Sequence, residues 1–196
     1  MSERQTNMLE EMMAAGRGVI AVLIGDRRAT EYFDFSIRGL IGSFIAVVAV
    51  TALAGYLPMF VTKPSENESL VPVALVILSD AVTLAAQIAA VALLLRQIRR
   101  LDLLVPFLIA NNWWTFAFTL LLVALLAAGV TVPFSTTLIF YPWLAVNLLF
   151  VINIGRLILH LPAAQIALLV LATASGFLVG SLISLWLILP PELLQK

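Results

Sequence analysis

The sequence predicts an all-α integral membrane protein in which five transmembrane helices follow an amphipathic interfacial helix. Apolar residues make up 62% of the 196 residues and charged residues only 11%, whereas soluble domains carry about 25% charged residues. Five apolar stretches reach the length of roughly 20 residues that a helix needs to cross a bilayer. Nine of the eleven Lys and Arg residues fall on one side of the membrane that these stretches define.

Residues 1–35 form the predicted cytoplasmic segment, which contains the amphipathic helix. Because the first apolar span begins near Ser36, behind this charged segment, we expect an uncleaved anchor and not a cleavable signal peptide. Two interpretations of the helix stay open: it lies under the bilayer as an interfacial helix, or its Met-rich face docks a partner. Apolar residues recur in it at three- and four-residue spacing, at Leu9, Met12, Met13, Gly16, Ile20 and Leu23.

The expected five-helix bundle covers residues 36–189, and residues 190–196 form a short outer tail. Each span should be helical, because lipid offers no hydrogen-bond partners to backbone polar groups. The first span is expected to stop at Pro58 and the last at Pro190, since proline disrupts a helix. The predicted spans cover residues 37–57, 71–95, 104–130, 138–159 and 163–189.

The positions of the basic residues predict the orientation. Lys63 and Lys196 are the two that fall on the other side. The positive-inside bias therefore predicts a cytoplasmic N-terminus and an outer C-terminus. The segments on the cytoplasmic side carry Arg4, Arg17, Arg27, Arg28, Arg38, Arg96, Arg99, Arg100 and Arg156.

Small residues at four-residue spacing predict where the spans approach one another closely. Membrane helices associate where small side chains let their backbones come together. Tight packing within one chain and a homodimer face both fit this pattern. The candidate packing residues are Gly39 and Gly42 in the first span and Ala172, Gly176, Gly180 and Ser184 in the fifth.

Asp80 is the principal candidate for a binding residue inside the membrane. Thr83 and Gln87 follow it at i+3 and i+7, and Asn147 of the fourth span has a similar predicted depth. A carboxylate in a membrane helix costs about 2.5 to 3.5 kcal/mol, so we expect Asp80 to face the bundle. The group could form a proton or cation site, or it could make a polar contact that fixes helix register.

A second polar cluster is predicted near the inner leaflet. Asn153, Arg156 and His160 share one face of the fourth span, and Asn111 and Asn112 lie near the start of the third. These side chains could form a small vestibule in which Arg156 binds a lipid phosphate. Alternatively, Arg156 reaches the head groups by itself and the Asn side chains bond to neighbouring backbones.

Several classes of function are excluded by residues that the sequence lacks. It contains no Cys and a single His, so neither a thiolate site nor a multi-histidine metal site is expected within one chain. No G-x-S-x-G, H-E-x-x-H or phosphate-loop motif occurs, and we expect neither an enzyme nor a cofactor. The net charge of zero gives no attraction to nucleic acid.

Four short motifs resemble the Yip (Ypt-interacting protein) family of five-pass membrane proteins, particularly its small bacterial members. The resemblance covers most of the chain from residue 15 to residue 189. The resemblance implies the same topology and a bacterial inner membrane. The Asp-Leu-Tyr-Gly-Pro motif of the eukaryotic trafficking members is absent, so the resemblance does not carry their GTPase binding to this chain. The motifs are Phe33-Asp34-Phe35-Ser36, Ala110-Asn111-Asn112-Trp113, Tyr141-Pro142-Trp143 and Leu161-Pro162-Ala163-Ala164.

Three functional hypotheses follow from these features. The first is a non-enzymatic protein that assembles with itself or with other membrane proteins, supported by the small-residue stripes and the Met-rich helix. The second is a small oligomeric transporter or ion-coupled carrier that uses Asp80 and Gln87. The third is a protein that binds membrane lipids at the inner leaflet.

Overall fold

The computed structural model describes residues 8–61, 73–128 and 136–188, and every secondary-structure element in these ranges is helical. The predicted outer tail lies outside them. The elements are α1 (Met8–Ile24), η1 (Arg27–Tyr32), α2 (Ile37–Val61), α3 (Val73–Gln97), η2 (Leu101–Leu103), α4 (Leu104–Ala127), α5 (Thr136–Asn153), the π-helical turn η3 (Ile154–Ile158) and α6 (Ala163–Ile188).

Five of these helices are long and apolar enough to cross a membrane, which confirms the predicted number of spans. They are α2, α3, α4 together with η2, α5 together with η3, and α6. Their flanks are strongly apolar: on α6, Leu171, Leu178, Leu182 and Trp186 are each exposed by 60% or more. A surface of this kind is suited to hydrocarbon and not to water.

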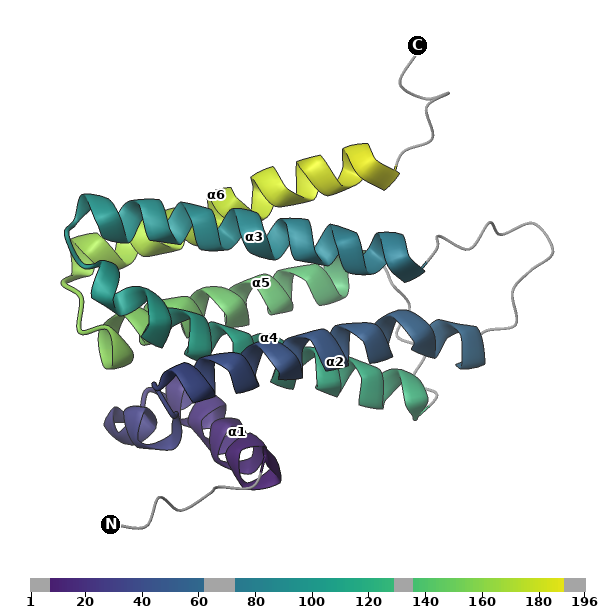
Figure 1. Cartoon of the computed structure of the whole chain (residues 1–196), viewed down its shortest axis with the longest axis horizontal. Coiled ribbons are helices and arrows are strands. Elements are labelled where there is room, and N and C mark those ends of the chain that lie inside the picture. The colour runs from purple at the N-terminus through teal and green to yellow at the C-terminus, as the bar shows by residue number, and fades with distance from the viewer. Residues whose placement is uncertain (1–7, 62–72, 129–135, 189–196) are drawn as a thin grey trace.

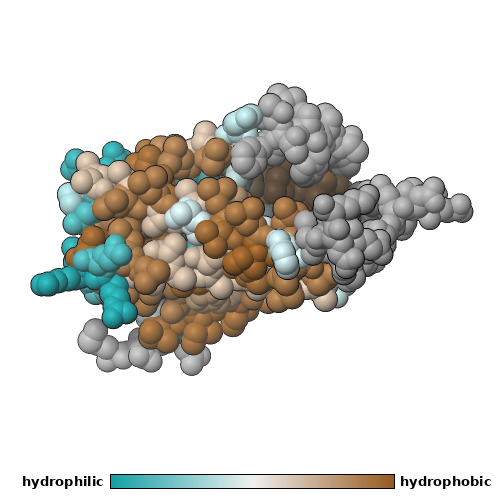
Figure 2. Space-filling view, turned by 90° about the horizontal axis from the view of Figure 1, so that it is seen from above, coloured by the Kyte–Doolittle hydropathy of each residue, from teal (hydrophilic) through white to brown (hydrophobic). Residues whose placement is uncertain are grey.

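Successive spans run in opposite directions, so α1, η1, the α3–α4 connection and the α5–α6 connection all lie at one end of the bundle (Figure 1). Figure 2 shows hydrophilic residues gathered at this end and apolar residues along the flank. We call it the arginine-rich end. Its arginines are Arg17, Arg27, Arg28, Arg38, Arg96, Arg99, Arg100 and Arg156.

The spans associate in pairs. The most extensive contact joins α3 to α6, and the next joins α2 to α4, while α5 lies between the two pairs (Figure 1). The buried core lies toward the arginine-rich end, where α1 packs against α4 and α5. The face of α1 that is buried there includes Ala15, Val19 and Val22.

The chain leaves α1 through a tight turn that glycine allows. Gly25 adopts a left-handed conformation with φ of 78°. Its N–H donates to the Val22 carbonyl (3.1 Å), and the Asp26 N–H donates to the Ala21 carbonyl (2.8 Å), which is the Schellman pattern of helix ends. The Asp26 side chain then accepts from the Arg28 N–H (2.9 Å) and caps η1. This turn places η1 beside α1.

Two helix boundaries differ from the sequence-based expectation. Helix α2 continues past Pro58 to Val61, because a proline in the last turn removes one backbone hydrogen bond without preventing that turn. The fourth span changes from α-helix to a π-helical turn after Asn153, with the Leu159 N–H donating to the Ile154 carbonyl (3.0 Å).

Candidate functional site

Two glycines of α6 bring its backbone against that of α3. A Cβ atom added at Gly180 would lie 2.5 Å from Thr83 Cα, and one added at Gly176 would lie 2.6 Å from Gln87 Cα. Side chains cannot approach backbone so closely, so both positions need glycine for this contact. Thr83 and Gln87, expected to belong to a binding site, are thus part of the α3–α6 contact.

Two hydroxyl groups and one backbone carbonyl complete the contact between α3 and α6. Ser184 is buried, and its hydroxyl donates to the Ser79 carbonyl (2.9 Å) and lies 3.2 Å from Thr83 Oγ1. The Thr83 hydroxyl lies 3.0 Å from the same carbonyl. These polar groups satisfy one another across the two helices, as membrane helix interfaces require.

We expected Asp80 to face the bundle, and this expectation was wrong. The residue is exposed on the flank of α3. Since successive residues of an α-helix are about 100° apart, turning Ser79 and Thr83 toward α6 turns Asp80 away from it. Three small residues, Ala81, Ala85 and Ala89, are exposed on the same helix. Together with Asp80 they span about half of the circumference of α3, the half turned away from α6, and we call this half the α3 outer face.

The other expected member of this site, Asn147, lies elsewhere. It is half-buried on α5, whereas α3 packs mainly against α6. The structure therefore does not bring Asp80, Thr83, Gln87 and Asn147 together as one polar site within a single chain.

The inner polar cluster is divided between two places, and the first is the end of α1. The Asn153 side chain donates to the Val22 carbonyl (2.8 Å) and weakly to the Leu23 carbonyl (3.4 Å), so it caps α1 from α5. A Cβ atom added at Gly25 would lie 2.9 Å from a guanidinium nitrogen of Arg156. A cation beside the carboxyl end of a helix is favoured by the helix dipole. These two residues thus hold α1 in place.

The second place is the contact between α2 and α4. The buried Asn112 side chain donates to Ser43 Oγ (3.1 Å), and Ser43 donates to the Leu40 carbonyl (2.8 Å). Asn111 is half-buried on the same helix. His160 is exposed beyond η3, with φ of 50°, and its Nδ1 lies 3.1 Å from the Ile158 carbonyl. The five polar residues therefore do not form one vestibule.

The predicted packing residues of α2 contact the N-terminal segment. A Cβ atom added at Gly39 would overlap the Asp34 carbonyl, and one added at Gly42 would lie 2.8 Å from Glu11 Oε1. Ala172 of α6 is half-buried against the core. Gly39 and Gly42 thus accommodate the segment before α2 and the helix α1.

An aromatic ladder through α4, α5 and α6 was not anticipated from the sequence. Trp114 stacks on Phe150, with ring centroids 4.7 Å apart and planes 20° apart, and also contacts Phe118 (5.6 Å). From Phe118 the contacts continue to Trp143 (6.3 Å) and then to Phe177 (5.7 Å). The ladder ties the middle of the bundle to α6.

Glu11 is a second residue that the sequence analysis missed. Its Oε1 is buried, with no hydrogen-bond partner among the described residues. Burial raises the pKa of Glu11 above its ordinary value of 4.5, the Asp34 carboxylate raises it further, and Arg38 opposes both effects. Glu11 shares the buried face of α1 with Ala15 and Val19, and this helical spacing is the signal that could have revealed it.

The raised pKa of Glu11 makes the packing of α1 dependent on pH. The packed state binds the proton more tightly than the detached state, in which the pKa is near 4.5. We therefore expect α1 to be held best at low pH, and to loosen as the pH rises from 4.5 through the raised pKa. Hydrogen exchange of the α1 amides, corrected for intrinsic rates, measures this change.

Two variants test the assignment to Glu11. Glu11→Gln should keep α1 equally protected from exchange across this pH range, because an amide has no proton to lose. Glu10→Gln, at an exposed position, should leave the dependence as it is in the parent protein. A pH dependence that survives in Glu11→Gln would assign it to another group.

The described residues contain no group of three or more His, Cys, Asp or Glu side chains that could hold a metal ion. The part of the chain that the structure describes is all-helical, with five helices long and apolar enough to cross a membrane, consistent with an integral membrane protein. Comparisons with protein families, with curated proteins and with solved structures give no match. The resemblance to the Yip family therefore stays a prediction.

Proposed function

We propose that this chain is a non-enzymatic integral membrane protein that assembles with another membrane helix through the α3 outer face. The observation that carries the proposal is the exposed carboxyl group of Asp80 on an apolar flank. Asp80 lies seven residues from the start of α3, about 10 Å from that end. A group at this depth meets hydrocarbon unless a partner covers it.

The cost of exposing the carboxyl group to lipid favours a partner with a hydrogen-bond donor. A charged acid at the centre of a membrane helix costs about 2.5 to 3.5 kcal/mol. A donor on a neighbouring helix would recover part of that cost, since hydrogen bonds between membrane helices contribute about 1 to 2 kcal/mol. Ala81, which of the exposed alanines lies nearest to Asp80 around the helix, would let the partner backbone come close. The partner is either another membrane protein or a second copy of this chain.

We also propose that the arginine-rich end faces the cytoplasm, as the positive-inside rule predicts. The eight described arginines at that end support this orientation. A bacterial inner membrane is proposed from the resemblance to the Yip family. A reporter fused after residue 196 that is active in the cytosol would overturn the orientation.

Photocrosslinking from the α3 outer face tests the proposed assembly. A photoreactive residue at Ala85 in native membranes should give one discrete adduct, whose mass tells a second copy from another protein. Asp80→Leu should reduce the adduct about 5- to 30-fold, the equivalent of 1 to 2 kcal/mol, whereas Asp80→Asn should retain most of it because an amide still bonds to a donor. The chain should insert normally in all variants.

A matched control position lies on the flank of α6. Leu178 is 60% exposed, and it shares the depth of Ala85 because Gly180 packs on Thr83 and Gly176 on Gln87. A photoreactive residue at Leu178 should give no discrete adduct. Equal adducts from both positions, or an undiminished adduct in Asp80→Leu, would refute assembly through the α3 outer face.

The carrier hypothesis needs the same face in an oligomer, because one chain does not gather its polar residues into a site. In such an assembly the carboxyl groups of Asp80 from several copies would line a shared interface. Asp80→Asn separates the two hypotheses, since the amide maintains assembly but cannot carry a proton. Loss of proton-linked flux in an assembled Asp80→Asn protein would favour the carrier.

A further inference from the structure

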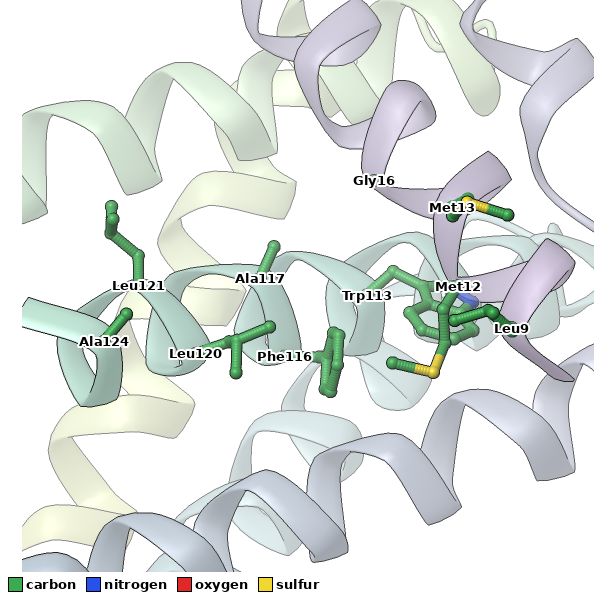
Figure 3. Close-up of a pocket in the computed structure, with 10 residues that line it drawn as sticks. All are labelled: Leu9, Met12, Met13, Gly16, Trp113, Phe116, Ala117, Leu120, Leu121 and Ala124. Atoms are coloured by element: carbon green, nitrogen blue, oxygen red, sulfur yellow. The ribbon is translucent and has the colours of Figure 1, made fainter. Parts of the chain in front are cut away.

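A groove of about 430 Å³ runs between α1 and α4 on the flank of the bundle (Figure 3). Residues of the first half of α1, among them Met12, Met13 and Gly16, form one wall. Residues of α4 from Trp113 to Ala124 form the other. The side chains that line the groove are apolar, so its occupant must be apolar along most of its length.

The dimensions of the groove select the kind of occupant. The α4 wall from Trp113 to Ala124 is about 16 Å long, because an α-helix rises 1.5 Å per residue. A volume of about 430 Å³ spread over that length makes the groove narrow and open along one side. A helix with its side chains measures about 10 to 12 Å across, so it could insert only one row of side chains and would not fit as a whole. A single hydrocarbon chain fits, and the flexible Met side chains adapt to its shape.

One hydrogen-bond donor lies in the wall nearest the arginine-rich end. Trp113 is 2% exposed, and its ring meets Phe116 edge-on, with centroids 5.6 Å apart. Its indole nitrogen is not one of the buried polar atoms that lack a partner in the described residues, so the N–H is accessible from the groove. In Figure 3 the nitrogen edge of the indole lies beside Leu9 and Met12. A buried tryptophan normally bonds through this group, so the occupant is expected to supply an acceptor.

Arg17 is the charged residue beside the groove that would favour an anionic head group, while Glu10 and Glu11 lie next to Leu9 and Met12 of the same wall. Arg17 is exposed and follows Gly16 of the groove wall, one helical turn after Met13. The polar features, Arg17 and Trp113, lie toward the arginine-rich end, and the purely apolar residues Leu121 and Ala124 lie farther along α4. This order matches a phospholipid: phosphate, then ester carbonyl, then hydrocarbon.

We propose that the groove between α1 and α4 holds one acyl chain of an anionic phospholipid. The phosphate lies by Arg17, an ester carbonyl accepts from the indole N–H of Trp113, and the hydrocarbon follows α4 to Ala124. The lipid thereby fills the space between α1 and the bundle. This site is separate from the α3 outer face and does not depend on the proposed assembly.

Mass spectrometry of the protein released from detergent micelles tests the site. The protein is reconstituted in vesicles of equal parts phosphatidylglycerol and phosphatidylcholine, then extracted. The parent protein should retain one phosphatidylglycerol. Ala117→Phe, which fills the groove, should lower that retention at least tenfold, and Arg17→Gln should keep a lipid but lose the preference for phosphatidylglycerol.

The groove between α5 and α6 supplies a matched control, since it also has a volume of about 430 Å³ and apolar walls but no tryptophan. Ala167→Phe in that groove should leave retention unchanged. Equal loss in Ala167→Phe, or full retention in Ala117→Phe, would overturn the proposal. A dimer that dissociates in Ala117→Phe would identify a second copy as the occupant and would overturn it as well.

Tryptophan fluorescence gives a second test that does not alter the groove. A variant in which Trp114, Trp143 and Trp186 are replaced by Phe leaves Trp113 as the emitter. Phosphatidylglycerol with brominated acyl chains should quench it more strongly than brominated phosphatidylcholine does. Equal quenching by both lipids would mean that no specific site exists. Crosslinking from Ala85 should be unaffected throughout, which separates this proposal from the proposed assembly.

Discussion

Replacing Gly180 by leucine is expected to separate α3 from α6. A Cβ atom at this position would lie 2.5 Å from Thr83 Cα and 3.2 Å from the Ala86 Cβ, so the two backbones must move apart. Overpacking of this kind costs about 1 to 3 kcal/mol even where side chains can yield, and here the obstacle is backbone. We therefore expect the free energy of unfolding to fall by about 3 kcal/mol or more.

Disulfide crosslinking measures that separation directly, because the chain contains no cysteine. Thr83→Cys and Ser184→Cys should crosslink readily in the parent protein, since the two hydroxyl oxygens are 3.2 Å apart. Adding Gly180→Leu should nearly abolish the crosslink. Ala174→Leu, at an exposed position on the same helix, should leave it intact. Efficient crosslinking in Gly180→Leu would refute the close packing of α3 and α6.

Trp114→Ala is expected to have the second large effect. The indole is 7% exposed and joins the ring of Phe150 to that of Phe118, so its removal breaks the aromatic ladder and leaves a cavity. Truncation of a buried tryptophan to alanine costs about 3 to 5 kcal/mol. For a chain of this size, the midpoint of thermal unfolding in mild detergent should fall by about 10 °C, measured by circular dichroism.

Two variants control for the chemistry of that substitution. Trp114→Phe retains an aromatic ring in the ladder and should lower the midpoint by less than half as much. Trp186→Ala removes an indole that is 70% exposed on α6 and should change it little. If Trp186→Ala were as damaging as Trp114→Ala, the ladder would not be the source of the stability.

Hydropathy and length predicted the five spans because each crossing must supply about 20 apolar residues, and this requirement does not depend on how the spans pack. Their boundaries were less predictable. Pro58 was expected to end the first span, yet a proline near a helix end affects only the last turn. The π-helical turn after Asn153 has no signature in the apolar pattern.

Small-residue spacing predicted a contact face on α6 but not its partner. The pattern of Gly176, Gly180 and Ser184 fits any helix that offers small or hydroxyl-bearing residues, and several spans do. The spacing of Gly39 and Gly42 is similar, but these residues receive the segment before α2 and the carboxyl group of Glu11. The spacing of small residues therefore predicts that another backbone packs closely against the helix, but it does not predict which segment that backbone belongs to.

The directions in which Asp80 and α1 face could not be predicted from the sequence. Ser79 and Asp80 are adjacent polar residues, and only one can face α6. The Ser184 hydroxyl of α6 donates to the backbone carbonyl of Ser79, so this donor is already used and would not be free for a carboxylate. Helix α1 is apolar on two faces: Ala15, Val19 and Val22 are buried, while Met13 and Ile20 of the predicted apolar stripe are more than 50% exposed.

The pairing of α3 with α6 also determines when this protein can finish maturing. Synthesis must add residues 98–188, a stretch of 91 residues, before α6 can reach the helix it pairs with. At about 5 to 20 residues per second, that interval lasts about 5 to 18 s. During it the hydroxyl of Thr83 can bond only within its own helix. Until the last span arrives, α3 lacks the helix against which it packs, so ribosome pausing within residues 163–188 should prolong this stage of biogenesis.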